Sequence, residues 1–286
     1  KLNDDGFYNL TVGATDIGQG SDTVITQIVA EALMTSVDKV IIYSSDTDLT
    51  PFDVGAYASS TTYVSGNAAL KAALKMKRML IKEAANYLNS KEEEVVFDGE
   101  KFTSKDKVLT LSDLANRLYY NENQHQLTAT ESYVGHKSPP PFMAGYVEIE
   151  LDTETGEYDI LHYVSVVDCG VTINPMLAKG QVEGGIVQGL GMACFEDVKY
   201  SNRGKLNSNS FLYYKIPSML DVKKLTTEFA ESFEESGPYG AKSVGEIGID
   251  TPPAAIANAV ANATGVRINK LPVTPEKIFQ GLNKGK

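Results

Sequence analysis

The sequence predicts an α+β protein built as two lobes. Apolar residues alternate in some segments, as in strands, and recur every three to four residues in others, as in helices. The two kinds of segment do not alternate regularly, which argues against one parallel α/β sheet. Residues 137–142, KSPPPF, contain three prolines that cannot continue a helix or a sheet. We therefore expect a first lobe over residues 1–140 and a second over residues 141–286.

The first lobe is expected to repeat a unit of strand, small-residue loop and helix. Residues 7–14 and 38–48 read as strands, and residues 23–34 and about 66–88 read as helices. The loops DIGQGSDT and AYASSTTYVSGN directly precede the two helix N-termini, where free backbone N–H groups and the helix dipole favour an anion. Ordinary N-capping is the better explanation of either loop alone. Two such loops in tandem favour a phosphate-bearing ligand.

The remaining elements follow from turn residues and periodicity. Residues 91–137 are charged and irregular, with a short helix near 111–120. AGYVEIELD and YDILHYVSVVDCG alternate strongly around the turn TETGE, which predicts a β-hairpin. We expect a loop with a short strand at 207–220 and a strand at 225–235. TPPAAIANAVANATG predicts a helix with proline at its start and Gly265 beyond its end.

Residues 176–193 have the apolar spacing of a helix but are unusually rich in glycine. The glycines are Gly180, Gly184, Gly185, Gly189 and Gly191. Each glycine in a helix interior costs about 0.5–1 kcal/mol relative to alanine. Such a helix needs compensation, and we expect close approach by another backbone or by a bulky ligand.

Composition excludes several classes of function. The net charge of -11 and pI of about 4.8 do not favour nucleic acid or anionic membranes. No apolar run approaches the roughly 18 residues of a membrane span, and residues 1–15 do not resemble a signal peptide. Two cysteines, Cys169 and Cys194, favour a reduced, cytoplasmic setting. The three histidines are scattered, so we expect no metal site built from side chains and no nucleophilic motif.

A single carboxylate stands out in GPYGAKSVGEIGI, residues 237–249. Glu246 lies among small and apolar residues and is flanked by Gly245 and Gly248. A surface acid in a turn is the ordinary explanation. Desolvation in an apolar loop would instead raise the pKa of this carboxyl and suit it to act as a general base.

Five segments in a fixed order resemble one family. They are DIGQGSDTVITQIVAEAL, YASSTTYVSGNAALKAA, VVDCGVTINPMLAKGQVEGGIVQGLG, FLYYKIPSMLDV and GAKSVGEIG. Together they resemble the C-terminal half of the molybdopterin-binding subunit of the molybdenum hydroxylases, the xanthine dehydrogenase and aldehyde oxidase family. The resemblance covers about residues 13–280. No single motif is decisive, and their order carries the resemblance.

The resemblance implies which residues bind the cofactor. They are Gly18, Gln19, Gly20, Ala58, Ser59, Ser60, Thr61, Asp168, Gln181 and Gly245. The first three match a loop that contacts the pterin and phosphate, and the next four match a loop that gives N–H and hydroxyl donors to the phosphate. Gln181 matches a glutamine that contacts the pterin. Asp168 lies where bacterial members contact the dinucleotide extension, and Glu246 matches the catalytic base.

The resemblance also implies the cofactor and the chemistry. The cofactor is molybdenum–molybdopterin, in its cytosine dinucleotide form, with a terminal sulfido or selenido ligand. The implied reaction hydroxylates an electron-poor carbon of an N-heterocycle, purine-like or nicotinate-like, with oxygen from water. Electrons leave to Fe–S clusters and FAD in partner chains. An aldehyde substrate stays open, as does a non-catalytic cofactor-binding or assembly role, against which Glu246 in its VGE context argues.

The implied partners follow from what the chain lacks. It has no cysteine clusters for Fe–S centres, no flavin domain and no initiator Met. We therefore expect it to be inactive alone. Its expected partners are a chain carrying the N-terminal half of the molybdopterin subunit, a [2Fe–2S] subunit and an FAD subunit, as in the split subunits of nicotinate dehydrogenase. Alternatively, it is a piece of a longer polypeptide.

Overall fold

The protein forms two compact units, which the computed structural model describes over residues 1–121 and 124–284. Within these residues, unit 1 comprises residues up to 139 together with 233–243. Unit 2 comprises residues 140–232 and the described residues from 244 onward. Residues 233–243 therefore come after part of unit 2 in the sequence but pack with unit 1. The predicted single boundary at residue 140 does not account for this return of the chain. Among these described residues, helices are mixed with three small separate sheets, which confirms the predicted α+β class.

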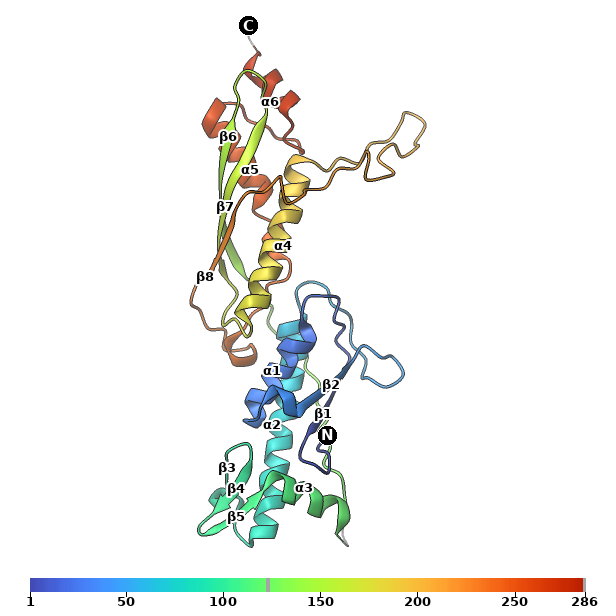
Figure 1. Ribbon diagram of the computed structural model, residues 1–286, viewed down its shortest axis with the longest axis vertical. Helices are drawn as coiled ribbons and strands as arrows, with labels where there is room; N and C mark the ends of the chain where they lie inside the picture. Colours follow the sequence, from blue (N-terminus) through green and yellow to red (C-terminus); the bar gives the residue numbers. More distant parts are fainter. Residues whose placement is uncertain (122–123, 285–286) are drawn as a thin grey trace. The chain divides into compact units, whose positions relative to one another are not determined.

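Unit 1 contains the expected repeat of strand, loop and helix (Figure 1). Strands β1 (Tyr8–Val12) and β2 (Val40–Ser44) are parallel, with Tyr8 opposite Val40. Helices α1 (Ser21–Leu33) and α2 (Thr61–Leu88) follow the two strands. Because both loops leave the carboxyl ends of parallel strands, they leave the same edge of the sheet.

Helix α2 begins earlier than predicted. The segment TTYVSGN was expected to be loop, but it forms the first two turns of α2. Asn67 Nδ2 donates to the carbonyl oxygens of Tyr63 (2.8 Å) and Ser236 (3.0 Å), and a Cβ on Gly66 would lie 3.3 Å from Cγ of Pro238. Packing against residues 233–243 thus outweighs the low helix propensity of serine, glycine and asparagine here.

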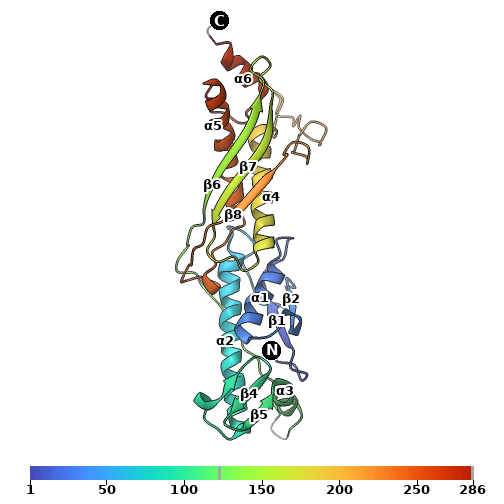
Figure 2. The same cartoon turned by 60° about the vertical axis from the view of Figure 1, so that its left-hand side comes forward.

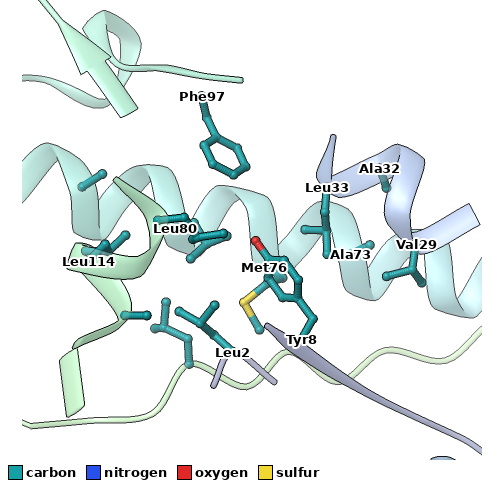
Figure 3. Packing of buried hydrophobic residues seen from close by; sticks show 14 of the residues in the cluster. Leu2, Tyr8, Val29, Ala32, Leu33, Ala73, Met76, Leu80, Phe97 and Leu114 are labelled. Atoms are coloured by element: carbon teal, nitrogen blue, oxygen red, sulfur yellow. The ribbon is translucent and has the colours of Figure 1, made fainter. Parts of the chain in front are cut away.

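The other end of α2 packs against elements that the sequence did not all predict. Helix α3 (Leu111–Tyr120) lies where it was expected, but the antiparallel sheet β3 (Val96–Phe97), β4 (Lys101–Ser104) and β5 (Lys107–Thr110) was missed. Figure 3 shows the shared core, in which Met76 and Leu80 of α2 lie among side chains from several elements. The labelled neighbours are Leu2, Tyr8, Val29, Ala32, Leu33, Ala73, Phe97 and Leu114.

Unit 2 is a three-stranded sheet with helices on one face (Figure 2). Strands β6 (Phe142–Leu151) and β7 (Tyr158–Asp168) form the predicted hairpin, and β8 (Leu225–Phe229) pairs parallel to β7. One face of the sheet packs with α4 (Pro175–Cys194) and α5 (Pro252–Thr264) in a single core. Helix α6 (Pro275–Leu282) was not predicted, and the strand expected within 207–220 is wrong, because that segment forms turns with exposed side chains.

Short 3-10 turns complete the chain. They are η1 (Val37–Lys39), η2 (Glu92–Glu94), η3 (Pro238–Gly240) and η4 (Ile247–Ile249). None of the helices among residues 1–121 and 124–284 combines the length and apolarity that a membrane crossing requires.

Candidate functional site

The loop before α1 is organised by Asp16. Its carboxylate accepts hydrogen bonds from the backbone N–H of Gly18 (2.8 Å) and of Asp22 in the first turn of α1 (3.1 Å). Partial burial alone would raise the pKa of Asp16, but these hydrogen bonds and one from Gly20 together lower it. Asp16 therefore caps α1 although it precedes the N-cap residue, Gly20, in the sequence. It also accepts from backbone N–H groups that were expected to bind an anionic ligand. An Asp two residues before a glycine is the local signal that could have identified it.

Gln19 is held within the same loop. Its side-chain oxygen accepts from the N–H of Ile17 at 2.6 Å, and its Nε2 donates to the carbonyl oxygen of Thr15 at 2.9 Å. Gly18 and Gly20 have φ angles of 97° and 83°, which L side chains adopt only with strain. The GQG sequence thus builds a tight, internally bonded turn at the start of α1.

Three polar atoms in the first two turns of α1 are buried without a hydrogen-bond partner among the described residues. They are the hydroxyl oxygens of Ser21 and Thr26 and Oδ1 of Asp22. The other carboxylate oxygen of Asp22 accepts from the Ser44 hydroxyl at 2.9 Å, which ties α1 to the end of β2. Buried polar atoms are nearly always paired, so this cluster is suited to a polar group from outside the chain.

The loop before α2 is built differently. Ala58 and Ser59 both have left-handed backbones, with φ angles of 50° and 52°, although neither is glycine. Such conformations cost on the order of 1–3 kcal/mol each and are often found at ligand-binding loops. Ser60 is the N-cap residue, yet its hydroxyl donates back to the Tyr57 carbonyl at 2.8 Å and does not cap the helix. Simple side-chain capping therefore does not explain this loop.

In unit 2, the glycines of α4 bring another backbone against the helix. A Cβ on Gly185 would lie 3.0 Å from Cα of Gly248, and one on Gly248 would lie 2.6 Å from the Val182 carbonyl oxygen. A Cβ on Gly189 would lie 2.7 Å from the Ile249 carbonyl oxygen. The predicted close approach of a second backbone is confirmed at these positions.

Other glycines of α4 have no such neighbour. A Cβ on Gly180 or Gly184 would meet nothing within 4 Å among the described residues. Gln181, which the resemblance assigned to the pterin, is half-buried on this part of the helix. The N-terminal half of α4 thus presents an open backbone surface with an amide beside it.

Glu246 lies at the start of η4, the turn that packs against α4. Its carbonyl oxygen accepts from the N–H of Ile249 at 3.1 Å. Val244 and Ile247 are half-buried and pack against the core of unit 2, whereas Gly245 and Glu246 are exposed. The expected burial of Glu246 is therefore wrong for this chain, because its apolar neighbours turn inward and leave the carboxylate outside.

Asp168 ends β7 and stabilises the turn that follows. Its Oδ1 accepts from the N–H of Gly170 at 3.1 Å and from the Ser232 hydroxyl. These hydrogen bonds give Asp168 a structural role in the turn that follows β7. Among residues 1–121 and 124–284, no three His, Cys, Asp or Glu side chains form a group suited to a metal ion.

Within unit 1 the structure brings the two predicted loops to one end of the β1–β2 sheet. Within unit 2 it places Gly245 and Glu246 on a turn fixed to α4, the helix that also carries Gln181. Asp16 and the unpaired atoms of α1 are the additions that sequence reasoning missed.

Comparison with known proteins points to one family. A family model for the molybdopterin cofactor-binding domain matches residues 1–223. The chain is 38% identical, over 286 residues, to the putative xanthine dehydrogenase molybdenum-binding subunit of Escherichia coli strain K12, covering 98% of this chain and 38% of that protein. It is 36% identical, over 294 residues, to the gamma subunit of the 6-hydroxypseudooxynicotine dehydrogenase complex of Paenarthrobacter nicotinovorans, covering 98% of this chain and 37% of that protein.

Solved structures agree. Quinoline 2-oxidoreductase from Pseudomonas putida 86 superposes with a TM-score of 0.91 at 27% identity, covering 99% of this chain and 38% of that one. Reconstituted CO dehydrogenase from Oligotropha carboxidovorans gives a TM-score of 0.87 at 27% identity, covering 99% and 36%. The chain thus spans well under half the length of each of these proteins.

Proposed function

The chain belongs to the family of molybdopterin cofactor-binding domains, and we propose that it supplies cofactor contacts and the catalytic base of a molybdenum hydroxylase. The observation that carries the proposal is the contact of Gly248 with Gly185, which fixes the turn bearing Glu246 against a glycine-rich helix. Catalysis requires a base held in a constant position. A backbone-to-backbone contact provides that constancy better than a mobile surface loop.

The residues of unit 1 fit the polar parts of the cofactor. Ser59 and Thr61 place hydroxyls at the start of α2, where the helix dipole favours a phosphate, and Ser60 would join them by turning its hydroxyl away from the Tyr57 carbonyl. The unpaired buried atoms of Ser21 and Thr26 suit the many hydrogen-bonding groups of a pterin. Because Asp16 already occupies the N–H groups of Gly18, Gly20 and Asp22, we assign the phosphate to the loop of residues 58–61. We assign the pterin edge to the loop of Gly18, Gln19 and Gly20 through its carbonyl oxygens and the remaining N–H and lone pair of the Gln19 amide.

The residues of unit 2 fit a flat ligand. Gly180 and Gly184 leave room for a ring to lie against the backbone of α4, and the Gln181 amide offers both a donor and an acceptor. Asp168 and Gly245 stay in the proposed set, Asp168 near the dinucleotide extension. We propose that 1–140 is the first lobe of the molybdenum-cofactor-binding domain and that 141–286 is the second lobe, which supplies Glu246.

The cofactor and Glu246 have separate roles in the proposed reaction. The molybdenum cofactor, when bound, supplies the redox chemistry of hydroxylation. Glu246 accepts the proton that is released as oxygen from water is transferred to the substrate carbon. Its exposure within this chain leaves the carboxylate accessible to a substrate, and the anchored η4 turn holds it in place.

We propose an electron-poor carbon of an N-heterocycle as the site of attack. Relatives named for xanthine and solved relatives named for quinoline support this class. The cytosine dinucleotide form, the sulfido or selenido ligand, and partner chains with the remaining molybdopterin half, [2Fe–2S] clusters and FAD belong to the same proposal. Measuring the turnover of xanthine, nicotinate and an aromatic aldehyde by the native protein distinguishes an N-heterocycle substrate from the aldehyde-oxidising alternative.

The base assignment is tested by Glu246→Gln in the native protein with its partners. We expect kcat to fall by roughly 10²–10⁴, the usual contribution of general acid–base catalysis, because the amide cannot accept the proton. Molybdenum content, measured by elemental analysis, should stay unchanged. Asp250→Asn, which removes another exposed carboxylate four residues away, should keep normal turnover. Full activity of Glu246→Gln would show that another group is the base.

Cofactor binding is tested separately by Thr61→Val. This change removes one hydroxyl at nearly constant volume, and a hydrogen bond to a charged group contributes about 1.5–3 kcal/mol. We expect cofactor affinity to fall roughly 10–100-fold, so that less molybdenum and phosphate are retained after dialysis. Thr62→Val, the neighbouring half-buried threonine, is the matched control. Equal retention in both variants would contradict the assignment of the phosphate to this loop, without bearing on Glu246.

A further inference from the structure

The loop of residues 58–61 is enclosed by a hydrogen bond between the chain before it and the helix after it. The Ser65 hydroxyl, in the second turn of α2, donates to Oδ2 of Asp53 at 2.9 Å. The two residues are 12 positions apart in the sequence, and the whole loop lies between them. Because Ser65 is only 6% exposed, water competes little for this bond. The bond therefore closes the loop at its base.

The other oxygen of the same carboxylate shapes the chain that enters the loop. Oδ1 of Asp53 accepts from the N–H of Gly55 at 2.9 Å, and Gly55 has a φ angle of 114°, which side chains other than glycine adopt only with strain. Tyr57 N–H then donates to the Gly55 carbonyl oxygen at 3.1 Å, and Ser60 N–H donates to the Tyr57 carbonyl oxygen at 3.2 Å. Asp53 thus begins a series of turns that ends at the N-cap residue of α2.

Asp53 is itself held against the end of a strand. Gly13 directly follows β1, and a Cβ on Gly13 would lie 2.1 Å from the Pro51 carbonyl oxygen and 2.9 Å from Cβ of Asp53. The backbone at the end of β1 therefore lies directly against residues 51–53, and a side chain at position 13 would displace them. One carboxylate thus connects the end of β1, the entry to the loop and helix α2.

The enclosed loop has a conformation that requires such support. Ala58 and Ser59 hold left-handed backbones, which persist in residues other than glycine only where surrounding contacts enforce them. A loop that already holds its donors in place loses less conformational entropy on binding a ligand than a loop that must become ordered. Closure by Asp53 and Ser65 therefore favours the binding of an anion at the start of α2.

We propose that Asp53 is a positioning residue, which acts through Ser65 to fix residues 58–61 in the conformation that binds the cofactor phosphate. The inference deepens the proposed function and rests on it. Both oxygens of Asp53 already accept from Gly55 and Ser65, so its role requires no contact with the cofactor. Loss of these bonds should weaken cofactor retention, whereas turnover per retained molybdenum should stay unchanged.

Hydrogen exchange of the cofactor-free native protein, resolved to single amides, tests the positioning. Asp53→Ala and Ser65→Ala should each speed exchange of the Ser60 amide by about tenfold or more, because its partner is the Tyr57 carbonyl and it responds only through the loop. The double variant should exchange no faster than Asp53→Ala, because one bond links the two residues. Asp53→Asn, whose amide can still bond Gly55 and Ser65, should keep most of the protection. An unchanged Ser60 amide in Asp53→Ala would overturn the proposal.

Retention of molybdenum and phosphate by the native protein with its partners tests the link to the cofactor. On dialysis, Asp53→Ala should lose both about tenfold faster than the unsubstituted protein. Asp98→Ala is the matched control, because Asp98 also organises a turn by accepting from the N–H groups of Glu100 and Lys101. It should change neither Ser60 exchange nor retention.

Two results of the retention assay would overturn the proposal. They are normal retention in Asp53→Ala and equally rapid loss in Asp98→Ala, which would indicate general destabilisation. Thr61→Val in the same assay shows whether the proposed function fails as well. Reduced retention in Thr61→Val leaves the phosphate at residues 58–61 without a role for Asp53, whereas normal retention in both variants places the phosphate elsewhere.

Discussion

Helix α4 places glycine in two contrasting settings. In its middle, Gly185 and Gly189 allow the backbone of η4 and the start of α5 to touch the helix. Nearer its N-terminus, Gly180 and Gly184 touch nothing within 4 Å among the described residues. At Gly185 and Gly189 the packing contacts offset the low helix propensity of glycine. Gly180 and Gly184 together cost about 1–2 kcal/mol in helix propensity, and no contact among the described residues offsets this cost. The contrast indicates that the open pair serves something that the chain binds.

Substitution in the packed setting should have the largest effect. Gly189→Ala puts a Cβ 2.7 Å from the Ile249 carbonyl oxygen and 2.8 Å from Cγ of Pro252. Overpacking of this kind costs about 1–3 kcal/mol, and the gain in helix propensity offsets only about 1 kcal/mol. We expect a lower midpoint in urea unfolding. Turnover should fall as well, because the same contact positions the turn that carries Glu246.

The outcome that would break the comparison is a Gly189→Ala protein with unchanged or higher stability. In that case the backbone contact would relax without cost, and the packed and open settings would be equivalent. Pairing the measurement with Gly184→Ala, the same change on the same helix, removes the contribution of helix propensity from the difference.

Substitution of an open glycine should raise the stability of the protein, whereas substitution of a packed glycine should lower it. Gly184→Ala adds a methyl group where nothing lies within 4 Å, so only the helix propensity changes. We expect the free energy of unfolding of cofactor-free protein to rise by about 0.5–1 kcal/mol. If the open face receives a flat ring, the same methyl group should lower molybdopterin retention, measured as pterin fluorescence after extraction. Higher stability with unchanged retention would locate the ring elsewhere.

The fold also differs from element to element in how well it could be predicted from the sequence. Regular spacing predicted α1, α3, α4, α5 and the β6–β7 hairpin, because their patterns are long and locally consistent. The strands β3 to β5 were missed, since segments of two to four residues carry too little pattern. The early start of α2 depends on contacts with Ser236 and Pro238, which lie far away in the sequence.

The candidate site was foreseen unevenly for the same reason. The two loops before helices and the glycine-rich helix follow from local residue types. The exposure of Glu246 depends instead on which neighbours turn into the core, and the role of Asp16 depends on the conformation of its loop. The unpaired atoms of Ser21 and Thr26 are visible only once burial is known.

The last effect is expected at the far end of α4, where packing is again close. Burial raises the pKa of the Cys194 thiol to about 11, and a hydrogen bond with Tyr158 offsets part of this. An exposed thiol has a pKa of about 8.5, so at pH 8 Cys194 should react with a maleimide roughly two orders of magnitude more slowly. The folded state keeps a proton that the unfolded chain releases near pH 9, so stability should fall as pH rises from about 9 to 11. Asn202→Cys, eight residues further along in an exposed loop, provides the reference rate in the same protein. Equal labelling of the two cysteines would mean that this end of α4 opens readily, and the close packing that distinguishes it from the open N-terminal half would be lost.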